Sequence, residues 1–298
     1  MSCCGPSRDK NQLSSKRFQN RSPYANSNDM QVASENLASR SRESSSFCLP
    51  TKKKPTPGCC INIGANQPVE YPDPAIYSQA EQLNLGNIPN WDNPDIVTNN
   101  WSPFRLMSES QVTVHNLSPS ASAINTLVHF YTSPFGIGTV KTLLASKVVS
   151  LPPGSQTLLT YPLPQDTLAG DQRIGVHVKI EHPTDNNYMN NEGSQVHDGS
   201  YTTESGRNFT LSIPVVNNSN FTRQILLSIM PTDLIATITN ANHNFAPYEQ
   251  IIAQLHIEVP AFLVGTPAAI IERAVTVVGR LAGGELVGGA TKLLRINN

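Results

Sequence analysis

The feature that most constrains the fold is an alternation of apolar and polar residues that recurs through the body of the chain. It is clearest at residues 174–181 (IGVHVKIE), and it appears again at residues 111–115, 125–131 and 140–149. A period of two places successive side chains on opposite faces of a β-strand, so that one face can be buried while the other meets water. These four segments are therefore expected to be half-buried antiparallel strands.

Turn-forming residues separate the alternating segments at short intervals. Pro119, Pro134 and Gly154 lie between the first runs, and a second set of alternating residues follows Gly206. The apolar members of that second set are Phe209, Leu211, Ile213, Ile225, Leu227, Ile229, Leu255, Ile257 and Val259. Short strands with turns every ~8–12 residues are typical of β-sandwiches. We therefore expect a mainly β fold with two tandem immunoglobulin-like β-sandwiches, at residues 93–195 and 196–262.

The N-terminal segment differs in composition from the rest. Residues 1–60 hold ten Lys and Arg against four Asp and Glu, whereas the remaining residues hold 11 against 18. The segment also carries twelve serines and few large apolar side chains, which is too little buriable surface to offset the entropy of ordering. We expect a disordered basic tail at residues 1–60, followed at residues 61–92 by an irregular Pro- and Asn-rich lead-in with Trp91 as an anchor.

The C-terminal stretch changes period. Its apolar residues recur at spacings of three and four after Pro267, at Ile270, Ile271, Ala274, Val275, Val278, Leu281 and Ala282. This spacing predicts an amphipathic helix within residues 263–298. Small residues spaced by four would permit close helix contact, and they form the pairs Gly279 with Gly283 and Gly284 with Gly288. The helix could dock on the second sandwich, associate with itself or lie on a membrane surface.

The five cysteines all lie in or next to the tail, at Cys3, Cys4, Cys48, Cys59 and Cys60. No disulfide can therefore join strands of either sandwich. The pairs Cys3 with Cys4 and Cys59 with Cys60 are candidates for lipidation beside the basic run at residues 52–54, or for intermolecular cross-linking. Incidental free thiols are the alternative. Zinc is less favoured, since the tail has no His and no CxxC spacing.

Few residues of the body suggest catalysis. His197, Asp198 and Ser200 have the residue types of a catalytic triad, but they are expected to share one loop, where they would not line up as base, orienting group and nucleophile. His177 and His256 occupy positions of alternating strands that are expected to face solvent. No catalytic residue is assigned.

A loop at residues 181–192 contains oxygen ligands for a weak calcium site. The candidates are Glu181, Asp185 and Glu192, although their spacing does not follow that of an EF-hand. The sequence indicates no other metal site and no cofactor.

Part of the first expected sandwich resembles a known family. The segments are Asp95 with Ile96, residues 112–134 (VTVHNLSPSASAINTLVHFYTSP), residues 149–163 (VSLPPGSQTLLTYPL) and residues 173–187 (RIGVHVKIEHPTDNN). They resemble the CARDB-like bacterial immunoglobulin-type repeat, in which a strand ends in an Asn-rich turn and a Pro-Gly turn precedes a Thr-rich strand. The resemblance covers about residues 93–195. It implies an adhesive accessory module at a cell surface rather than a catalyst.

The first 30 residues contain Arg8, Lys10, Lys16 and Arg17 but no apolar run, so no secretory signal is expected. No stretch is long and apolar enough for a transmembrane helix. The default expectation is a cytoplasmic protein, with a surface or assembled structure as the alternative.

Together these patterns predict a non-enzymatic protein that recognises another protein or assembles with itself. One alternative is a membrane-tethered adaptor held by an acylated tail. Another is a hydrolase accessory module or an enzyme with a dispersed site. Nucleic-acid binding is not favoured, because the excess positive charge of the tail is modest. No small-molecule substrate is evident.

Overall fold

The computed structural model describes residues 70–101, 104–164, 173–185, 187–203, 208–260 and 271–297. The chain divides into two compact units, residues 1–65 and 66–298, and the described residues all lie in the second. The predicted tail and its cysteines Cys3, Cys4, Cys48, Cys59 and Cys60 fall outside the described residues.

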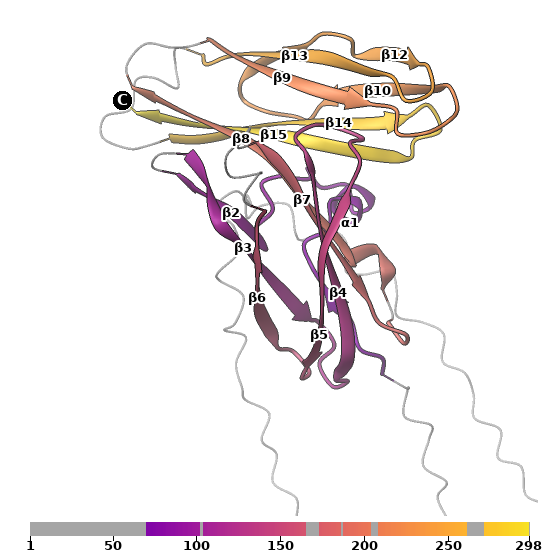
Figure 1. Ribbon diagram of the computed structural model, residues 1–298. Coiled ribbons are helices and arrows are strands. Elements are labelled where there is room, and N and C mark those ends of the chain that lie inside the picture. Colours follow the sequence, from indigo (N-terminus) through magenta and orange to yellow (C-terminus); the bar gives the residue numbers. More distant parts are fainter. Residues whose placement is uncertain are drawn as a thin grey trace, which may run out of the picture. The chain divides into compact units, whose positions relative to one another are not determined.

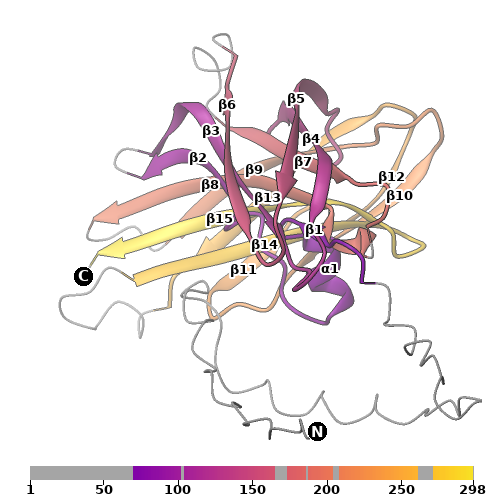
Figure 2. The ribbon, with the colours of Figure 1, turned by 90° about the horizontal axis from the view of Figure 1, so that it is seen from below.

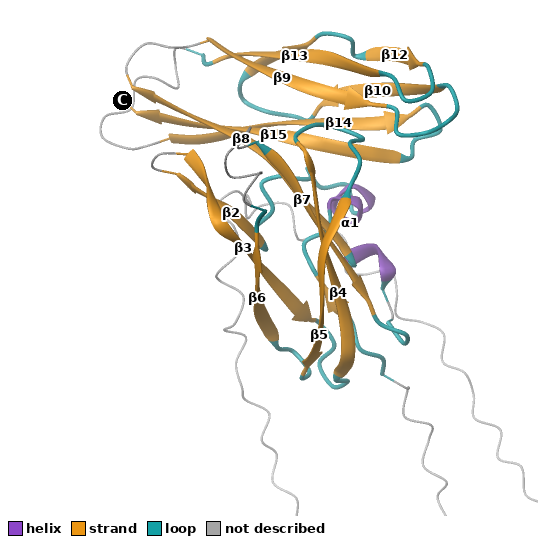
Figure 3. Cartoon of the chain, viewed as in Figure 1, coloured by secondary structure: helices purple, strands orange, loops and turns teal. Residues whose placement is uncertain are grey.

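Strands make up most of the described part (Figure 3), which confirms the predicted mainly β fold. Its helices are α1 (Gln79–Asn84) and a 3-10 turn at Tyr188–Asn190, and no helix found there could span a membrane. The strands are β1 (Pro74–Ala75), β2 (Ile96–Trp101), β3 (Phe104–Asn116), β4 (Ala123–Pro134), β5 (Thr142–Leu151), β6 (Gln156–Pro162), β7 (Ile174–Glu181), β8 (Glu192–Thr203), β9 (Asn208–Val216), β10 (Arg223–Ile229), β11 (Ile235–Ile238), β12 (Asn242–Phe245), β13 (Gln250–Glu258), β14 (Ile271–Leu281) and β15 (Leu286–Asn297).

Eight strands form one continuous sheet in the order β12-β10-β14-β15-β8-β7-β4-β5 (Figure 1). β8 is the strand at which the two halves of this sheet meet. Its residues 192–196 pair antiparallel with β7, and its residues 197–203 pair in parallel with β15 (Figure 2). The expected boundary between residues 195 and 196 therefore falls inside a strand that both halves share.

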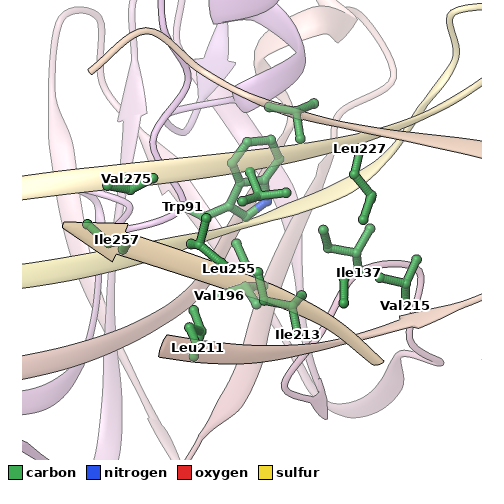
Figure 4. Packing of buried hydrophobic residues seen from close by; sticks show 14 of the residues in the cluster. Trp91, Ile137, Val196, Leu211, Ile213, Val215, Leu227, Leu255, Ile257 and Val275 are labelled. Carbon is green, nitrogen blue, oxygen red and sulfur yellow. The ribbon is translucent and has the colours of Figure 1, made fainter. Parts of the chain in front are cut away.

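Two smaller sheets complete two sandwiches on this long sheet. The sheet of β1, β3, β2 and β6 packs against β7, β4 and β5 around a core that includes Phe130, Tyr161 and Val176. The sheet of β11, β13 and β9 packs against the other end around a core that includes Ile213 and Leu255 (Figure 4). We call these the first and second sandwich.

The two cores lie on opposite faces of the long sheet. Residues directly opposed on neighbouring strands share a face. Val176 of the first core is opposed to Gln195, whereas Leu294 of the second core is opposed to Ser200. Residues 195 and 200 are five apart in β8, and side chains alternate along a strand. Each half of the long sheet thus uses a different face for its core.

The predicted C-terminal amphipathic helix is wrong for residues 271–297, which form the hairpin of β14 and β15. Val275, Val277 and Val278 are all fully buried, so that β14 is covered on both faces. A strand buried on both faces shows no alternation, and its apolar residues then fit a helical spacing by coincidence.

The predicted helix contacts between glycines are therefore also wrong. Gly279 of β14 is directly opposed to Gly288 of β15, while Gly283 and Gly284 lie in the turn of the hairpin. The positive φ of Gly284, 93°, suits glycine in such a turn.

A buried asparagine closes the turn that follows β3. Asn116 is 1% exposed, and its Nδ2 donates hydrogen bonds to the carbonyl oxygens of Ala121, Leu151 and Pro152 at 2.8–3.1 Å. Leu151 and Pro152 belong to the connection between β5 and β6. One side chain thus joins the ends of both sheets of the first sandwich.

The second sandwich contains the same arrangement. Asn217 follows β9, is also 1% exposed, and donates from Nδ2 to the carbonyl oxygens of Phe221 and Ala246 at 2.7 and 2.8 Å. The backbone N–H of Asn217 donates to the carbonyl oxygen of Glu249, just as the backbone N–H of Asn116 donates to the carbonyl oxygen of Ser155.

The backbone of the partner turns also matches. The N–H of Gly154 donates to the Ser118 carbonyl oxygen, and the N–H of Tyr248 donates to that of Ser219. Gly154 and Tyr248 both have positive φ, 63° and 58°. A non-glycine residue rarely adopts this conformation, so its presence at the equivalent position shows that the turn geometry overrides local preference. The two sandwiches therefore share one structural plan.

We predict that Asn116→Ala lowers the free energy of unfolding by about 3 kcal/mol, because it leaves buried carbonyl groups without donors. Asn217→Ala should act in the same direction. Urea unfolding of the purified protein measures both. Asn242→Ala is the control: its side chain accepts an exposed hydrogen bond from Gln224, and a change within ~0.5 kcal/mol is expected. Equal effects at all three positions would contradict the prediction.

Candidate functional site

The first half of β8 is bordered by the segment that precedes β2. Ser78 caps α1 by accepting a hydrogen bond from the N–H of Glu81, which places Gln79 at the first helical position. The amide of Gln79 then accepts from the N–H of Ser194 at 3.0 Å and donates to the carbonyl oxygen of Ser194 at 2.6 Å. Further along, the N–H of Val196 donates to the Trp91 carbonyl oxygen. A side-chain amide thus takes the place of a neighbouring strand.

Trp91 connects this segment to β15. It is 2% exposed, and its backbone N–H donates a hydrogen bond to Thr291 Oγ1 at 2.9 Å. Its side chain, labelled in Figure 4, belongs to the same buried cluster as Val196 and Leu227. A Cβ atom added at Gly289 would lie 2.6 Å from carbons of this ring. Glycine is therefore required at position 289 for the indole to reach the sheet.

His177 is the centre of a buried polar cluster at the junction. Its Nε2 lies 2.9 Å from Ser133 Oγ in β4, and its Nδ1 lies 2.8 Å from Ser194 Oγ in β8. One ring nitrogen donates and the other accepts, since the neutral imidazole has one of each. The prediction that His177 faces solvent is wrong, because the segment after β4 covers this face, where Thr139 Oγ1 also donates to Ser133 Oγ. His256 is exposed, as expected.

Burial lowers the pKa of His177 to about 3, and the positive charge of Lys141 acts in the same direction. The ring is therefore neutral at physiological pH. It borders a shallow hollow of about 240 Å³ that is also lined by Tyr131, Lys179 and Glu192. A general base must gain a proton during catalysis, and that charged form is strongly disfavoured here. The arrangement suits a neutral imidazole on β7 that links the hydroxyl groups of the two neighbouring strands, β4 and β8.

The other histidine of the junction lies on β8 itself. The expectation that His197, Asp198 and Ser200 share a loop is wrong, because all three belong to this strand. His197 Nδ1 lies 2.7 Å from Asp92 Oδ1, and its Nε2 lies 2.8 Å from Asn99 Oδ1. Consecutive residues of a strand point to opposite faces, so His197 and Asp198 do not meet. They do not form a catalytic triad.

Asp198 instead pairs with Lys292, the residue directly opposed to it on β15. Lys292 Nζ lies 2.5 Å from Asp198 Oδ2, and the two side chains are only 4% and 17% exposed. Sequence analysis missed this pair, because 94 residues separate its members and because residue 292 was assigned to a helix.

The three calcium candidates have separate surroundings. Glu181 Oε1 lies 2.8 Å from Lys179 Nζ, which lowers the pKa of Glu181. Asp185 Oδ2 accepts a hydrogen bond from Asn191 Nδ2 at 2.7 Å, while Glu192 borders the hollow beside His177. Within the described ranges, no three His, Cys, Asp or Glu side chains converge as a group that could hold a metal ion.

Two Asn-x-Ser triplets that fit the N-glycosylation pattern, at Asn116 and Asn217, have a structural explanation. Their amide groups are the buried donors of the repeated turn. The shared Asn-x-Ser triplet is the sequence signal that marks the turn repeated after β3 and β9.

No protein-family model matches the chain, and no curated protein matches its sequence. Among solved structures, Escherichia coli alpha-2-macroglobulin activated by porcine elastase is similar over 78% of this chain, with 8% identity and a TM-score of 0.24, and the chain spans 22% of its length. The CupB6 tip adhesin from Pseudomonas aeruginosa is similar over 67% of this chain and 92% of its own, with 8% identity and a TM-score of 0.15. Similarities this low carry no argument about fold or function.

We predict that His177 contributes to the pH dependence of stability. The folded pKa of about 3 lies below the ordinary value of 6.5, so the stabilisation by neutral His177 is complete above pH 6.5 and is lost as the pH falls towards 3. The loss should reach about 4 kcal/mol. Urea unfolding between these pH values should show a shallower slope for His177→Gln than for wild type. The control His256→Gln should keep the wild-type slope; equal slopes for all three proteins would refute the prediction.

We also predict that Gly289→Ala lowers the free energy of unfolding by ~1–3 kcal/mol, because the new methyl group displaces the Trp91 ring. Gly283→Ala is the matched control, since a Cβ there meets nothing within 4 Å. Thermal unfolding followed by tryptophan fluorescence compares the two. A Gly289→Ala protein as stable as the control would show that the indole is not packed against this position.

Proposed function

We propose that the chain is a non-enzymatic assembly module, and that it associates with a second copy of itself by pairing of its β5 edges. The observation that carries this proposal is the position of β5 at the end of the long sheet. Within the described part of the chain, its ten residues pair with β4 alone. An unpaired strand edge presents free N–H and C=O groups to which another strand can bind.

The other terminal strands offer less. β11 and β12 have four residues each. The outer edge of β9 is partly occupied, because Ile137 exchanges backbone hydrogen bonds with Pro214 and Val216. On β6, the carbonyl oxygen of Thr160 accepts a hydrogen bond from Lys147 Nζ. β2 pairs with β3 alone but has only six residues, so among the described strands β5 has the longest open edge.

The side chains of β5 favour association as well. Leu143 and Val148 are 52% and 64% exposed, and they are directly opposed to Tyr131 and Leu127 of β4. These two apolar pairs face solvent near the edge of the sheet, on either side of the polar pair His129 and Ser146. β5 carries a single charged side chain, Lys147, and it is engaged within the same molecule, with its Nζ 4.6 Å from the centre of the Tyr161 ring and bonded to the Thr160 carbonyl oxygen of β6. Antiparallel pairing of two β5 strands would close as a two-fold dimer.

The fold type belongs to the same proposal. We infer that both sandwiches are immunoglobulin-like and that the first is a CARDB-like repeat, an adhesive accessory module. The support is the buried asparagine turn, which lies in the segment that carries the resemblance and recurs in the second sandwich.

Sedimentation velocity over a range of concentrations, under reducing conditions that exclude disulfides between tail cysteines, tests the assembly. We expect a dimer for wild type and a dissociation constant raised by at least about tenfold in the double variant Leu143→Lys, Val148→Lys, because four lysines then meet at the two-fold axis. The control Ile235→Lys alters a similarly exposed residue of β11, 54% exposed, and should leave the dimer intact. A wild-type protein that stays monomeric at every concentration would overturn the proposal.

A further inference from the structure

Lys292 and Asp198 form an ion pair whose two side chains are held in close contact by the pairing of their strands. The two residues are directly opposed on neighbouring parallel strands, so the backbone holds both side chains in place. Lys292 Nζ and Asp198 Oδ2 are 2.5 Å apart. When two reacting groups are already held in contact, the translational and rotational entropy that a bimolecular reaction must lose no longer contributes to the activation barrier.

Apolar, buried residues flank the pair along its two strands. On the same face of the sheet, Lys292 lies between Ala290 and Leu294 along β15 and is opposed to Val275 of β14, and Val196 precedes Asp198 by two residues on β8. These four residues are at most 2% exposed. Two full charges are costly to keep away from water. Condensation needs the amine and the carboxylic acid, and a single proton transfer from Nζ to the carboxylate within this contact would supply both.

We propose that Lys292 and Asp198 condense to form an intramolecular amide cross-link between β15 and β8. The lone pair of the neutral Nζ attacks Cγ of the protonated Asp198, which forms the Nζ–Cγ bond. The C–OH bond then breaks, and the hydroxyl group leaves with a proton from the nitrogen as one water molecule. The atoms balance without an oxidant, a reductant or any further reactant. The low exposure of Lys292, 4%, limits the access of water to the nitrogen side of the new bond.

The cross-link would join the two sandwiches covalently. β8 carries the first sandwich through β7, and β15 belongs to the hairpin that builds the second. An amide bond between them would keep β8 and β15 joined even where the backbone hydrogen bonds between these two strands open.

Peptide mapping of the purified full-length protein tests the proposal. Trypsin cleaves after free lysine, so an amide at Lys292 blocks cleavage there. The expected product is a branched peptide that joins residues 180–207 to residues 281–295 and weighs one water less than the two peptides together. Separate peptides, with cleavage after Lys292, would overturn the proposal.

Two variants and one internal control sharpen this test. Asp198→Ala removes the acid and Lys292→Arg removes the reactive amine, so the branched peptide should disappear from both. Lys179 and Glu181 form the matched control, since they also lie in contact, at 2.8 Å, but are 44% and 48% exposed. Trypsin should cleave after Lys179 in every sample. The wild-type map decides the question by itself if either variant fails to fold.

Discussion

The backbone hydrogen bonds of β8 are the interaction on which the rest of the described structure depends. A strand has two edges, and β8 uses them for different partners at its two ends. Its residues 192–196 bind β7 on one edge and Gln79 and Trp91 on the other, and its residues 197–203 bind β15. The two sandwiches are therefore parts of a single sheet, not separate domains on a linker.

The polar residues of the junction serve this continuity. Gln79 satisfies the N–H and the carbonyl group of Ser194 where no strand lies, and His177 links the hydroxyl groups of two flanking strands. Buried polar groups are stabilising only where each has a partner. Their placement around β8 explains why so many hydrogen-bonding side chains are buried in a region without catalytic geometry.

The strands of the first sandwich were predictable because their alternation is local. The predicted strand at residues 174–181 coincides with β7, since one of its faces packs on a core. The C-terminal hairpin was not predictable in the same way, because burial of β14 on both faces erased the period. His177, His197 and Lys292 were misassigned for a related reason. Their burial depends on partners such as Ser194, Asp92 and Asp198, and pairing between distant segments leaves no mark in the spacing of nearby residues.

The parallel pairing of β8 with β15 also sets an order of folding. β8 emerges from the ribosome 94 residues before its partner at Lys292. During that interval the strands of the first sandwich can pair with β7, while the backbone N–H and C=O groups on one edge of residues 197–203 still lack their partners from β15. Contacts between distant segments form slowly, because a long loop must close before they are made. Until residues 291–297 are made, this edge of β8 is therefore open to pairing with a strand of another chain.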